Sequence, residues 1–318
     1  MRFLLLFLAL PLGAQTRTPI LIDTDIGDAI DDSLALALAV NSPELDVRGV
    51  TTVIDDVESK TKLAWKELTL LGRRDIPLAM GVSEPLLDPV VQSKPKEFEA
   101  LTKADAVPEA ARRSAVGLIV ETLMNAREPI TIVAIGPLTN IALALKTEPR
   151  IKQKLARIVL MGGAFSNQSA TPRAEYNVKR DPVAAEIVFH SGVAITAVGL
   201  EVTEPCKLRE QDLAKLRNSD APAVRFLLHL IDLSKAETGD AYPTLYDPLA
   251  VAVVFRKELI EASAGAVSVS LADASRGQTR FTAGAGGAVQ VGTKVNVPAF
   301  LDLFTARLSR SGMAGPPR

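Results

Sequence analysis

The chain has 318 residues, with 36 basic and 37 acidic side chains and a formal net charge of −1. Hydrophobic residues make up 47% of it and charged residues 23%, which are ordinary globular values and exclude a wholly disordered chain. The balanced charge gives no bulk basic field, so we expect neither nucleic acid nor a membrane as a partner. The single cysteine, Cys206, excludes an intramolecular disulfide and a Cys-rich zinc site, and two histidines argue against a His-based metal cage.

The first fourteen residues are typical of a secretory signal peptide. Arg2 is followed by the apolar run FLLLFLALPLGA, whose small residues Gly13 and Ala14 predict cleavage near Ala14. An apolar run of about a dozen residues is too short to span roughly 30 Å of hydrocarbon. We therefore expect an exported protein, periplasmic or secreted, with one domain over residues 18–308 and a frayed tail over 309–318.

Strand-like and helix-like segments alternate along the rest of the chain. Strands are predicted over residues 19–23, 45–54, 76–81, 130–136, 156–163 and 194–201. Helices are predicted over residues 31–40, 61–71, 115–126, 138–147 and 182–190, with later helices between about 209 and 255. The proline- and charge-rich segment 83–110 shows no clear periodicity and indicates a loop or lid. The alternation predicts an α/β fold with an open, mostly parallel, Rossmann-like sheet flanked by helices.

Five carboxylates lie within ten residues where the first predicted strand ends. The run DTDIGDAIDD contains Asp23, Asp25, Asp28, Asp31 and Asp32. Ligands of open α/β sheets bind at the carboxyl ends of strands, and carboxylates this close repel one another unless a cation lies among them. Hard oxygen ligands suit Ca²⁺ or Mg²⁺. Helix capping would account for one or two of the five, and for Asp28 we favour a cap over an acid that supports a metal site.

The segment PILIDTDIGDAIDDSLALAL resembles the N-terminal signature of the inosine-uridine-preferring nucleoside hydrolase family: a DxD, a glycine, a DD pair and an Ala/Leu-rich helix. Further segments resemble the family's other blocks in the same order: VRGVTTV (47–53), VAIGPLTNIALAL (133–145), IVLMGGAF (158–165) with AEYNVKRDPVAAEIVF (174–189), and YDPLAVA (246–252). The likeness covers residues from about 19 to 255 and extends more loosely to 308. One DxD alone is a weak signal, but ordered blocks along the chain are specific.

The resemblance implies an enzyme that binds one Ca²⁺ per subunit, cleaves the N-glycosidic bond of ribonucleosides to ribose and free base, and forms a homodimer or homotetramer. The implied metal ligands are Asp25, Asp32, the carbonyl of Ile135, and Asp247. Asp31 is implied as the general base on a water, and Asp23 as support for the cluster. Implied substrate contacts are Met161, Glu175 and Asn177, together with two departures from the family pattern, Asp56 and Ser169, which stand where several members have asparagine.

These roles are chemically coherent. Glycoside cleavage passes through an oxocarbenium-like transition state, which carboxylates beside the sugar stabilise. A divalent ion lowers the pKa of water and grips a cis-diol, so ribose is favoured over deoxyribose.

The site of the leaving base departs most from the family pattern. Well-studied members place a histidine just before the late Asp-Pro, where this chain has Tyr246, and segment 83–110 contains no histidine. We interpret His190 and His229 as packed or surface helix residues. Tyr246 or Tyr242 is a candidate to contact the base, unless the base leaves without an acid. Candidates to stack on the base are Phe165, Tyr176 and Tyr242, although Phe165 and Tyr176 are equally consistent with core positions.

Two other classes of protein share parts of this pattern. A strand followed by DTD resembles the nucleophile motif of haloacid-dehalogenase-like phosphatases, but the order of the remaining motifs does not fit. A periplasmic binding protein fits the leader, size and α/β pattern, but a neutral ligand does not require five clustered carboxylates. A nucleoside-binding relative that lacks turnover remains the closer alternative, because the histidines are missing.

Overall fold

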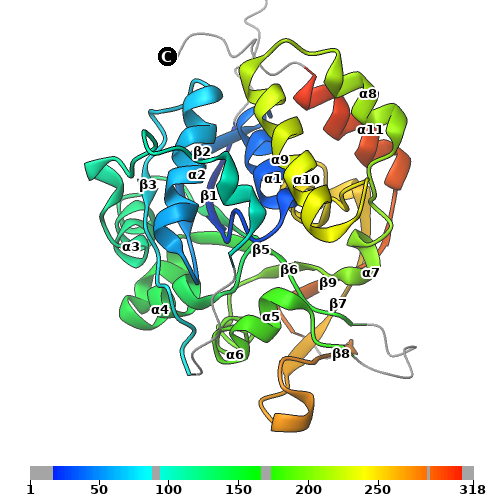
Figure 1. Cartoon of the computed structure of the whole chain (residues 1–318). Coiled ribbons are helices and arrows are strands. Elements are labelled where there is room, and N and C mark those ends of the chain that lie inside the picture. The colour runs from blue at the N-terminus through cyan, green and yellow to red at the C-terminus, as the bar shows by residue number, and fades with distance from the viewer. Residues whose placement is uncertain (1–16, 88–93, 166–172, 285–286, 310–318) are drawn as a thin grey trace, which may run out of the picture.

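The structure is a computed structural model that describes residues 17–87, 94–165, 173–284 and 287–309. Within these ranges, nine strands form one sheet in the order β3-β2-β1-β4-β5-β6-β9-β7-β8 (Figure 1). The strands are β1 Thr18–Thr24, β2 Leu45–Thr52, β3 Leu78–Ala79, β4 Ile130–Ala134, β5 Leu155–Met161, β6 Ile195–Val198, β7 Ile260–Val269, β8 Thr279–Ala283 and β9 Val289–Val295. Strands β1 to β6 and β9 pair in parallel, and β7 pairs antiparallel with β8 and β9. The predicted open, mostly parallel α/β sheet is confirmed.

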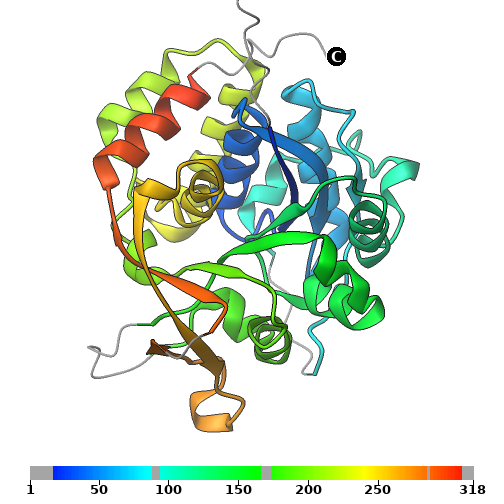
Figure 2. The ribbon, with the colours of Figure 1, turned by 180° about the vertical axis from the view of Figure 1, so that it is seen from behind.

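Helices flank the sheet on both sides. The α-helices are α1 Ile30–Val40, α2 Val57–Leu70, α3 Ala115–Met124, α4 Thr139–Thr147, α5 Tyr176–Arg180, α6 Pro182–Phe189, α7 Leu200–Thr203, α8 Glu210–Arg217, α9 Pro222–Thr238, α10 Tyr246–Phe255 and α11 Val297–Leu308. Short 3₁₀ helices are η1 Lys96–Ala100, η2 Glu109–Ala111, η3 Pro149–Lys154, η4 Lys257–Leu259 and η5 Asp273–Ser275. The two opposite views show α1, α9 and α10 on one side of the sheet and α3, α4 and α6 on the other (Figures 1 and 2).

The strand sequences explain the two layers, because successive side chains of a strand point to opposite faces. Ile20 and Ile22 of β1 pack in the core that includes α1, α9 and α10, whereas Leu21 between them packs in the core of α3, α4 and α6. Both faces are covered, so the strands are continuous apolar runs rather than alternating ones.

The carboxyl ends of β1 and β4 lie side by side where the winding of the sheet reverses direction. From β1 the chain proceeds through β2 to β3 at one edge, and from β4 it proceeds through β5 and β6 the other way. The backbone N–H of Ile135 donates to the carbonyl of Asp23 at 2.8 Å, which joins the two strand ends. Such a switch point is where open α/β sheets form their ligand crevice.

Several boundaries differ from the predictions. The strand expected over residues 76–81 is only Leu78–Ala79 with one bridge from Met80, as befits an edge strand, and α2 begins at Val57 rather than at residue 61 because Asp56 caps it. The antiparallel β7–β9 unit and α11 were not predicted. Segment 83–110 contains η1 and η2. The predicted signal peptide, Ser169 and most of the predicted tail lie outside the described residues. No helix in the described part of the chain is long and apolar enough to cross a membrane.

Candidate active site

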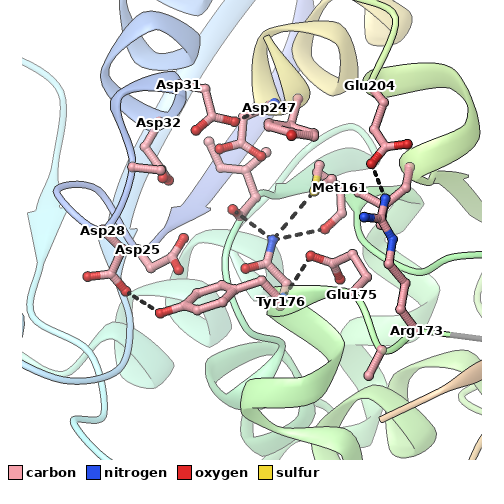
Figure 3. Close-up of a pocket in the computed structure, with 16 residues that line it drawn as sticks. Asp25, Asp28, Asp31, Asp32, Met161, Arg173, Glu175, Tyr176, Glu204 and Asp247 are labelled. Carbon is pink, nitrogen blue, oxygen red and sulfur yellow. Dashed lines mark hydrogen bonds and ion pairs between the residues drawn. The ribbon is translucent and has the colours of Figure 1, made fainter. Parts of the chain in front are cut away.

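A pocket of about 350 Å³ opens at the switch point and is lined mainly by acidic and polar side chains (Figure 3). Its walls come from the turn after β1, the first turns of α1 and α10, the ends of β4 and β5, and α5 with the residues before it. The carboxylates in its lining are Asp25, Asp28, Asp31, Asp32, Glu175, Glu204 and Asp247.

Three buried carboxyl groups form the centre of the pocket. Asp31, Asp32 and Asp247 each offer one oxygen, and these oxygens lie within 4.8 Å of one another. Asp31 and Asp32 occupy the first turn of α1 and Asp247 the first turn of α10, where the positive end of a helix stabilises an anion. Asp31 Oδ2 also accepts a hydrogen bond from the backbone N–H of Asp247 at 3.2 Å, which fixes one helix end against the other.

The mutual repulsion of these buried carboxyl groups favours a bound cation among them. Burial raises the pKa of Asp31 to about 6 and holds the pKa values of Asp32 and Asp247 well above their usual range, with mutual repulsion adding to both. Burial also raises the pKa of Asp25, which lines the same wall. A divalent ion among these oxygens would remove the repulsion and favour the ionised forms. The donor set, all hard oxygen, fits such an ion.

The strand end beneath the cluster is held by side-chain hydrogen bonds. The Thr24 hydroxyl donates to Asp32 and accepts from the N–H of Ile26 at 3.0 Å. Asp23 Oδ1 accepts from the Thr51 hydroxyl at 2.5 Å and from Asn140 Nδ2 at 2.8 Å. Burial raises the pKa of Asp23 to about 7 despite these donors. Asp23 therefore lies behind the cluster and ties β1 to its neighbours.

Two polar residues from α5 cross the floor of the pocket. Asn177 Nδ2 donates to the carbonyls of Ile135 at 3.3 Å and Met161 at 3.2 Å, which links the ends of β4 and β5. Glu175 caps α5 and accepts from the N–H groups of Gly163, Asn177 and Val178 at 3.0, 2.8 and 3.1 Å. Burial raises its pKa even so. The Ile135 carbonyl and Met161 also line the pocket.

The mouth of the pocket is more exposed, and it combines the predicted Tyr246 with two residues that the sequence analysis did not name. Tyr246 lines it, and burial together with the charges of Asp31 and Glu204 raises the pKa of its phenol. Arg173 and Glu204 form an ion pair beside it. Arg173 is adjacent to the AEYN block, which was a usable signal, whereas nothing in the sequence pattern singles out Glu204.

The interpretation of Asp28 as a helix cap is wrong. Helix α1 begins at Ile30, and its N-cap is Ala29, whose side chain has no oxygen to offer. Asp28 therefore lies one residue before the N-cap position. Its carboxylate instead pairs with Lys60 Nζ at 2.9 Å and accepts from the Tyr176 hydroxyl at 3.3 Å (Figure 3).

The remaining predicted site residues are divided between the pocket and the rest of the fold. Tyr176 is 48% exposed and lines the pocket, whereas Phe165 is buried and packs edge-on against Phe281 at 6.5 Å. Asp56 accepts from the N–H of Ser59 at 3.0 Å as the N-cap of α2, and neither Asp56 nor Tyr242 is among the described residues that line the pocket. His190 and His229 are exposed on the surface, one just after α6 and the other on α9, as interpreted from the sequence.

A crevice at the switch point of an α/β sheet, lined by buried carboxylates, is suited to a small polar ligand, and comparisons with known proteins identify the family. The family model of the inosine-uridine preferring nucleoside hydrolases matches residues 20–302. The chain therefore belongs to this family and is a hydrolase that acts on N-glycosyl compounds.

Individual relatives agree with this membership. The pyrimidine-specific ribonucleoside hydrolase RihA of Citrobacter koseri is 38% identical over 252 residues, which cover 76% of this chain and 80% of that protein. RihA of Escherichia coli is 37% identical over the same length and shares. Among solved structures, a plant nucleoside hydrolase, PpNRh1, matches with a TM-score of 0.82 at 29% identity, covering 92% of this chain and 99% of its own. A purine-preferring ribonucleoside hydrolase from Gardnerella vaginalis matches with a TM-score of 0.81 at 29% identity, covering 92% and 98%.

The family is metal-dependent in general, and the buried carboxyl cluster is a candidate site for its ion. Neither the phosphatase nor the binding-protein alternative gains support from these matches.

Proposed function

We propose that this chain is a Ca²⁺-dependent ribonucleoside hydrolase that yields ribose and a free base. The observation that carries the proposal is the buried cluster of Asp31, Asp32 and Asp247 at the N-termini of two helices. The pyrimidine-specific relatives make uridine and cytidine the first substrates to test, with inosine as the purine comparison.

The residues present fit Ca²⁺. Asp32 and Asp247 belong to the buried carboxyl cluster, and Asp25 and Ile135 line the same pocket. The two cluster carboxylates, Asp25 and the carbonyl of Ile135 would together supply the hard oxygen ligands that Ca²⁺ prefers. When bound, the ion would supply the positive charge that lowers the pKa of a nearby water and that attracts the hydroxyls of ribose. A requirement for Ca²⁺ would distinguish this site from a Mg²⁺ site, because Mg²⁺ prefers a smaller octahedral shell and retains its waters.

The chain's own residues divide the chemistry between them. Asp31 removes a proton from the attacking water, and its carboxylate is oriented for this by the N–H of Asp247. Asn177 and Glu175 hydrogen-bond sugar hydroxyls from the floor, and Met161 contacts the sugar. The surrounding carboxylates stabilise the positive charge that develops on the sugar ring.

Tyr246 is the candidate contact to the leaving base. Because the pKa of its phenol is raised, the hydroxyl stays protonated and donates a hydrogen bond more readily than it gives up its proton. Proton delivery by this residue is therefore weaker than by an imidazole, and the rate should depend strongly on how good the leaving base is.

We further propose export through cleavage near Ala14, and assembly into a homodimer or homotetramer. Amino-terminal sequencing of the protein recovered outside the cytoplasm tests the cleavage site, and light scattering tests the assembly. Uptake of external nucleosides as ribose and base is the role that follows from export together with the activity.

The deciding experiment is reducing-sugar release from uridine, cytidine and inosine by the mature protein, with added calcium and with EDTA. We expect release that EDTA abolishes and calcium, but not magnesium, restores. The absence of release from every nucleoside in the presence of calcium would overturn the proposed activity.

A further inference from the structure

The lining of the pocket carries one positive charge among many negative ones. Arg173 is the only lysine, arginine or histidine among the described residues that line it. A divalent ion in the buried carboxyl cluster would neutralise that end of the pocket only. A negative charge that forms elsewhere in the pocket is repelled by the surrounding carboxylates, and Arg173 is the one side chain that opposes this repulsion.

The guanidinium of Arg173 is held loosely and has donors to spare. Nη2 donates to Glu204 Oε1, and both side chains are exposed. An ion pair at such an exposed place contributes little free energy, so the guanidinium turns toward a ligand at small cost. A guanidinium has several N–H donors, and Glu204 is the only acceptor for them among the described residues. The remaining donors are therefore available to a ligand in the pocket.

Arg173 lies at the end of the pocket where the leaving base is expected. Figure 3 shows Arg173 and Glu204 on the opposite side of the pocket from Asp25. Tyr246, the candidate contact to the base, lines the pocket one residue before Asp247 in α10. Burial raises the pKa of the Tyr246 phenol, the charge of Glu204 adds to this effect and that of Arg173 opposes it, so both charges lie near this ring. A base in contact with Tyr246 is therefore within reach of Arg173.

The surroundings of Arg173 suit a flat ring. Ala174 follows it in the chain, and Leu200 lies one turn before Glu204 at the start of α7. Both residues line the pocket. A planar base that packs on such apolar side chains presents the oxygen atoms at its edge to the guanidinium.

Cleavage of the N-glycosidic bond creates the negative charge that Arg173 meets. The electron pair of the bond between C1′ and the base nitrogen passes to the base, and in uracil it is shared with the carbonyl oxygen next to that nitrogen. The attacking water bonds to C1′ through its oxygen and gives one proton to Asp31, which later releases it to solvent. A base that is not protonated in this step leaves as an anion and takes its proton from the solvent afterwards.

We propose that Arg173 donates hydrogen bonds to the carbonyl oxygen beside the glycosidic nitrogen of the leaving base and stabilises the negative charge that develops there. A guanidinium is always charged, so it does this without giving up a proton. The favoured substrates are then ribosides of pyrimidines with a carbonyl at that position, whereas adenine has no carbonyl oxygen at all. Glu204 keeps Arg173 beside the pocket between turnovers. This inference rests on the proposed function, because it assumes that the glycosidic bond is broken here.

The test compares Arg173→Gln with wild type on uridine, 5-fluorouridine and 4-nitrophenyl riboside, whose leaving groups form increasingly stable anions. We expect kcat/KM on uridine to fall roughly ten- to a hundredfold, the size of a lost charged hydrogen bond. The loss should be smaller on 5-fluorouridine and nearly absent on 4-nitrophenyl riboside, because 4-nitrophenolate needs no such help. Equal losses on all three substrates would overturn the inference, because they would show a general effect on the pocket.

Glu204→Gln separates the role of the guanidinium from that of the ion pair. It frees Arg173 from its counter-charge, so we expect uridine to be cleaved at least as fast as by wild type. A loss as large as that of Arg173→Gln would show that the pair only holds the chain at the mouth, and would overturn the inference. Arg217→Gln is the matched control, since Arg217 of α8 is similarly exposed, pairs with Glu210 and does not line the pocket. It should leave all three rates unchanged, and thermal unfolding of each variant verifies that it is folded.

A fourth substrate shows which part of the nucleoside Arg173 contacts. 5′-Deoxyuridine keeps the base and lacks the 5′-hydroxyl, so Arg173→Gln should slow its cleavage by the same factor as that of uridine. If the variant cleaved it as well as wild type does, Arg173 would bind the 5′-hydroxyl and the inference would be wrong.

A binding measurement separates this inference from the proposed activity. 5-Nitrouracil is an anion at neutral pH and serves as an analogue of the departing base. By calorimetry, we expect it to bind the calcium-loaded wild type roughly tenfold or more tightly than it binds Arg173→Gln. A wild type that shows this binding but releases no sugar from any riboside sinks the activity and leaves the contact of Arg173 with the base standing. If no riboside is cleaved and 5-nitrouracil binds both proteins equally or not at all, the inference falls as well.

Discussion

The two ends of the pocket are built differently. At the metal end, Asp25, Asp31, Asp32 and Asp247 are each at most 5% exposed and are positioned by strand ends and helix first turns. At the mouth, Arg173 and Glu204 have side chains 59% and 46% exposed. Rigid elements fix groups to the tolerance that bond cleavage requires, while residues at an exposed rim change easily without damage to the core. We therefore expect changes at the metal end to remove activity and changes at the mouth to alter which base is accepted.

The largest expected effect is that of Asp31→Asn. The amide oxygen of the asparagine can still accept from the backbone N–H of Asp247, so the contact between α1 and α10 is kept while the general base is lost. Loss of a general base lowers kcat by roughly 10²–10⁴-fold with a much smaller change in KM. Steady-state kinetics on uridine measures it. If the kcat of the variant stayed within a few-fold of the wild-type value, Asp31 would not be the general base. Activity would then not depend on this end of the pocket more than on the mouth.

The second prediction concerns calcium and Asp247. Calcium at about a hundred times its Kd should stabilise the wild type by about 2.7 kcal/mol, seen as a rise in Tm. Asp247→Asn removes one charged ligand and should abolish most of that rise, although the variant without calcium should be no less stable than the wild type, because mutual repulsion is relieved. If calcium raises the Tm of both proteins equally, the ion binds outside this cluster.

A smaller effect is expected at the mouth. Tyr246→Phe removes the hydroxyl that is the candidate donor to the base, at a cost of roughly five- to fifteenfold in kcat/KM on uridine, the size of one neutral hydrogen bond. A riboside with 4-nitrophenol as leaving group needs no such donor and should be cleaved equally well by both proteins. The measurement is the ratio of kcat/KM on uridine to kcat/KM on the 4-nitrophenyl riboside, determined for both proteins. A loss shared by both substrates would show that Tyr246 acts on the sugar or the fold rather than on the base.

The sequence could place Asp25, Asp31 and Asp32 together at one edge of the sheet because their signal is local. Asp23 to Asp32 lie in one short run, and the parallel α/β pattern states which sheet edge they occupy. Prediction from the sequence failed where the role of a residue depends on partners that are distant in the chain. The role of Asp28 is decided by Lys60, more than thirty residues away, and a lysine within an amphipathic helix gives no sign of being fully buried. Asp56 was expected at the substrate because it stands where several family members have asparagine, yet its side chain accepts from the backbone N–H of Ser59 as the N-cap of α2. The strands β7 to β9 were missed because small, weakly alternating residues such as those of ASAGAVSV carry little periodic signal.

The last prediction concerns stability rather than activity, at a buried carboxyl group of α2. Glu67 of α2 is 0% exposed, and burial holds its pKa well above the usual range. A carboxyl whose pKa is higher folded than unfolded is tolerated at low pH and costs stability as pH rises above its unfolded value near 4.5. Glu67→Gln removes the ionisation, so we expect little change in the free energy of unfolding at pH 4.5 and a gain of about 1–3 kcal/mol at pH 8. Urea unfolding at both values measures it, with the exposed Glu58→Gln as control on the same helix. A gain that is equal at the two pH values would mean that the pKa of Glu67 is the same in the folded and unfolded protein, so that burial of this carboxyl group does not penalise its ionised form.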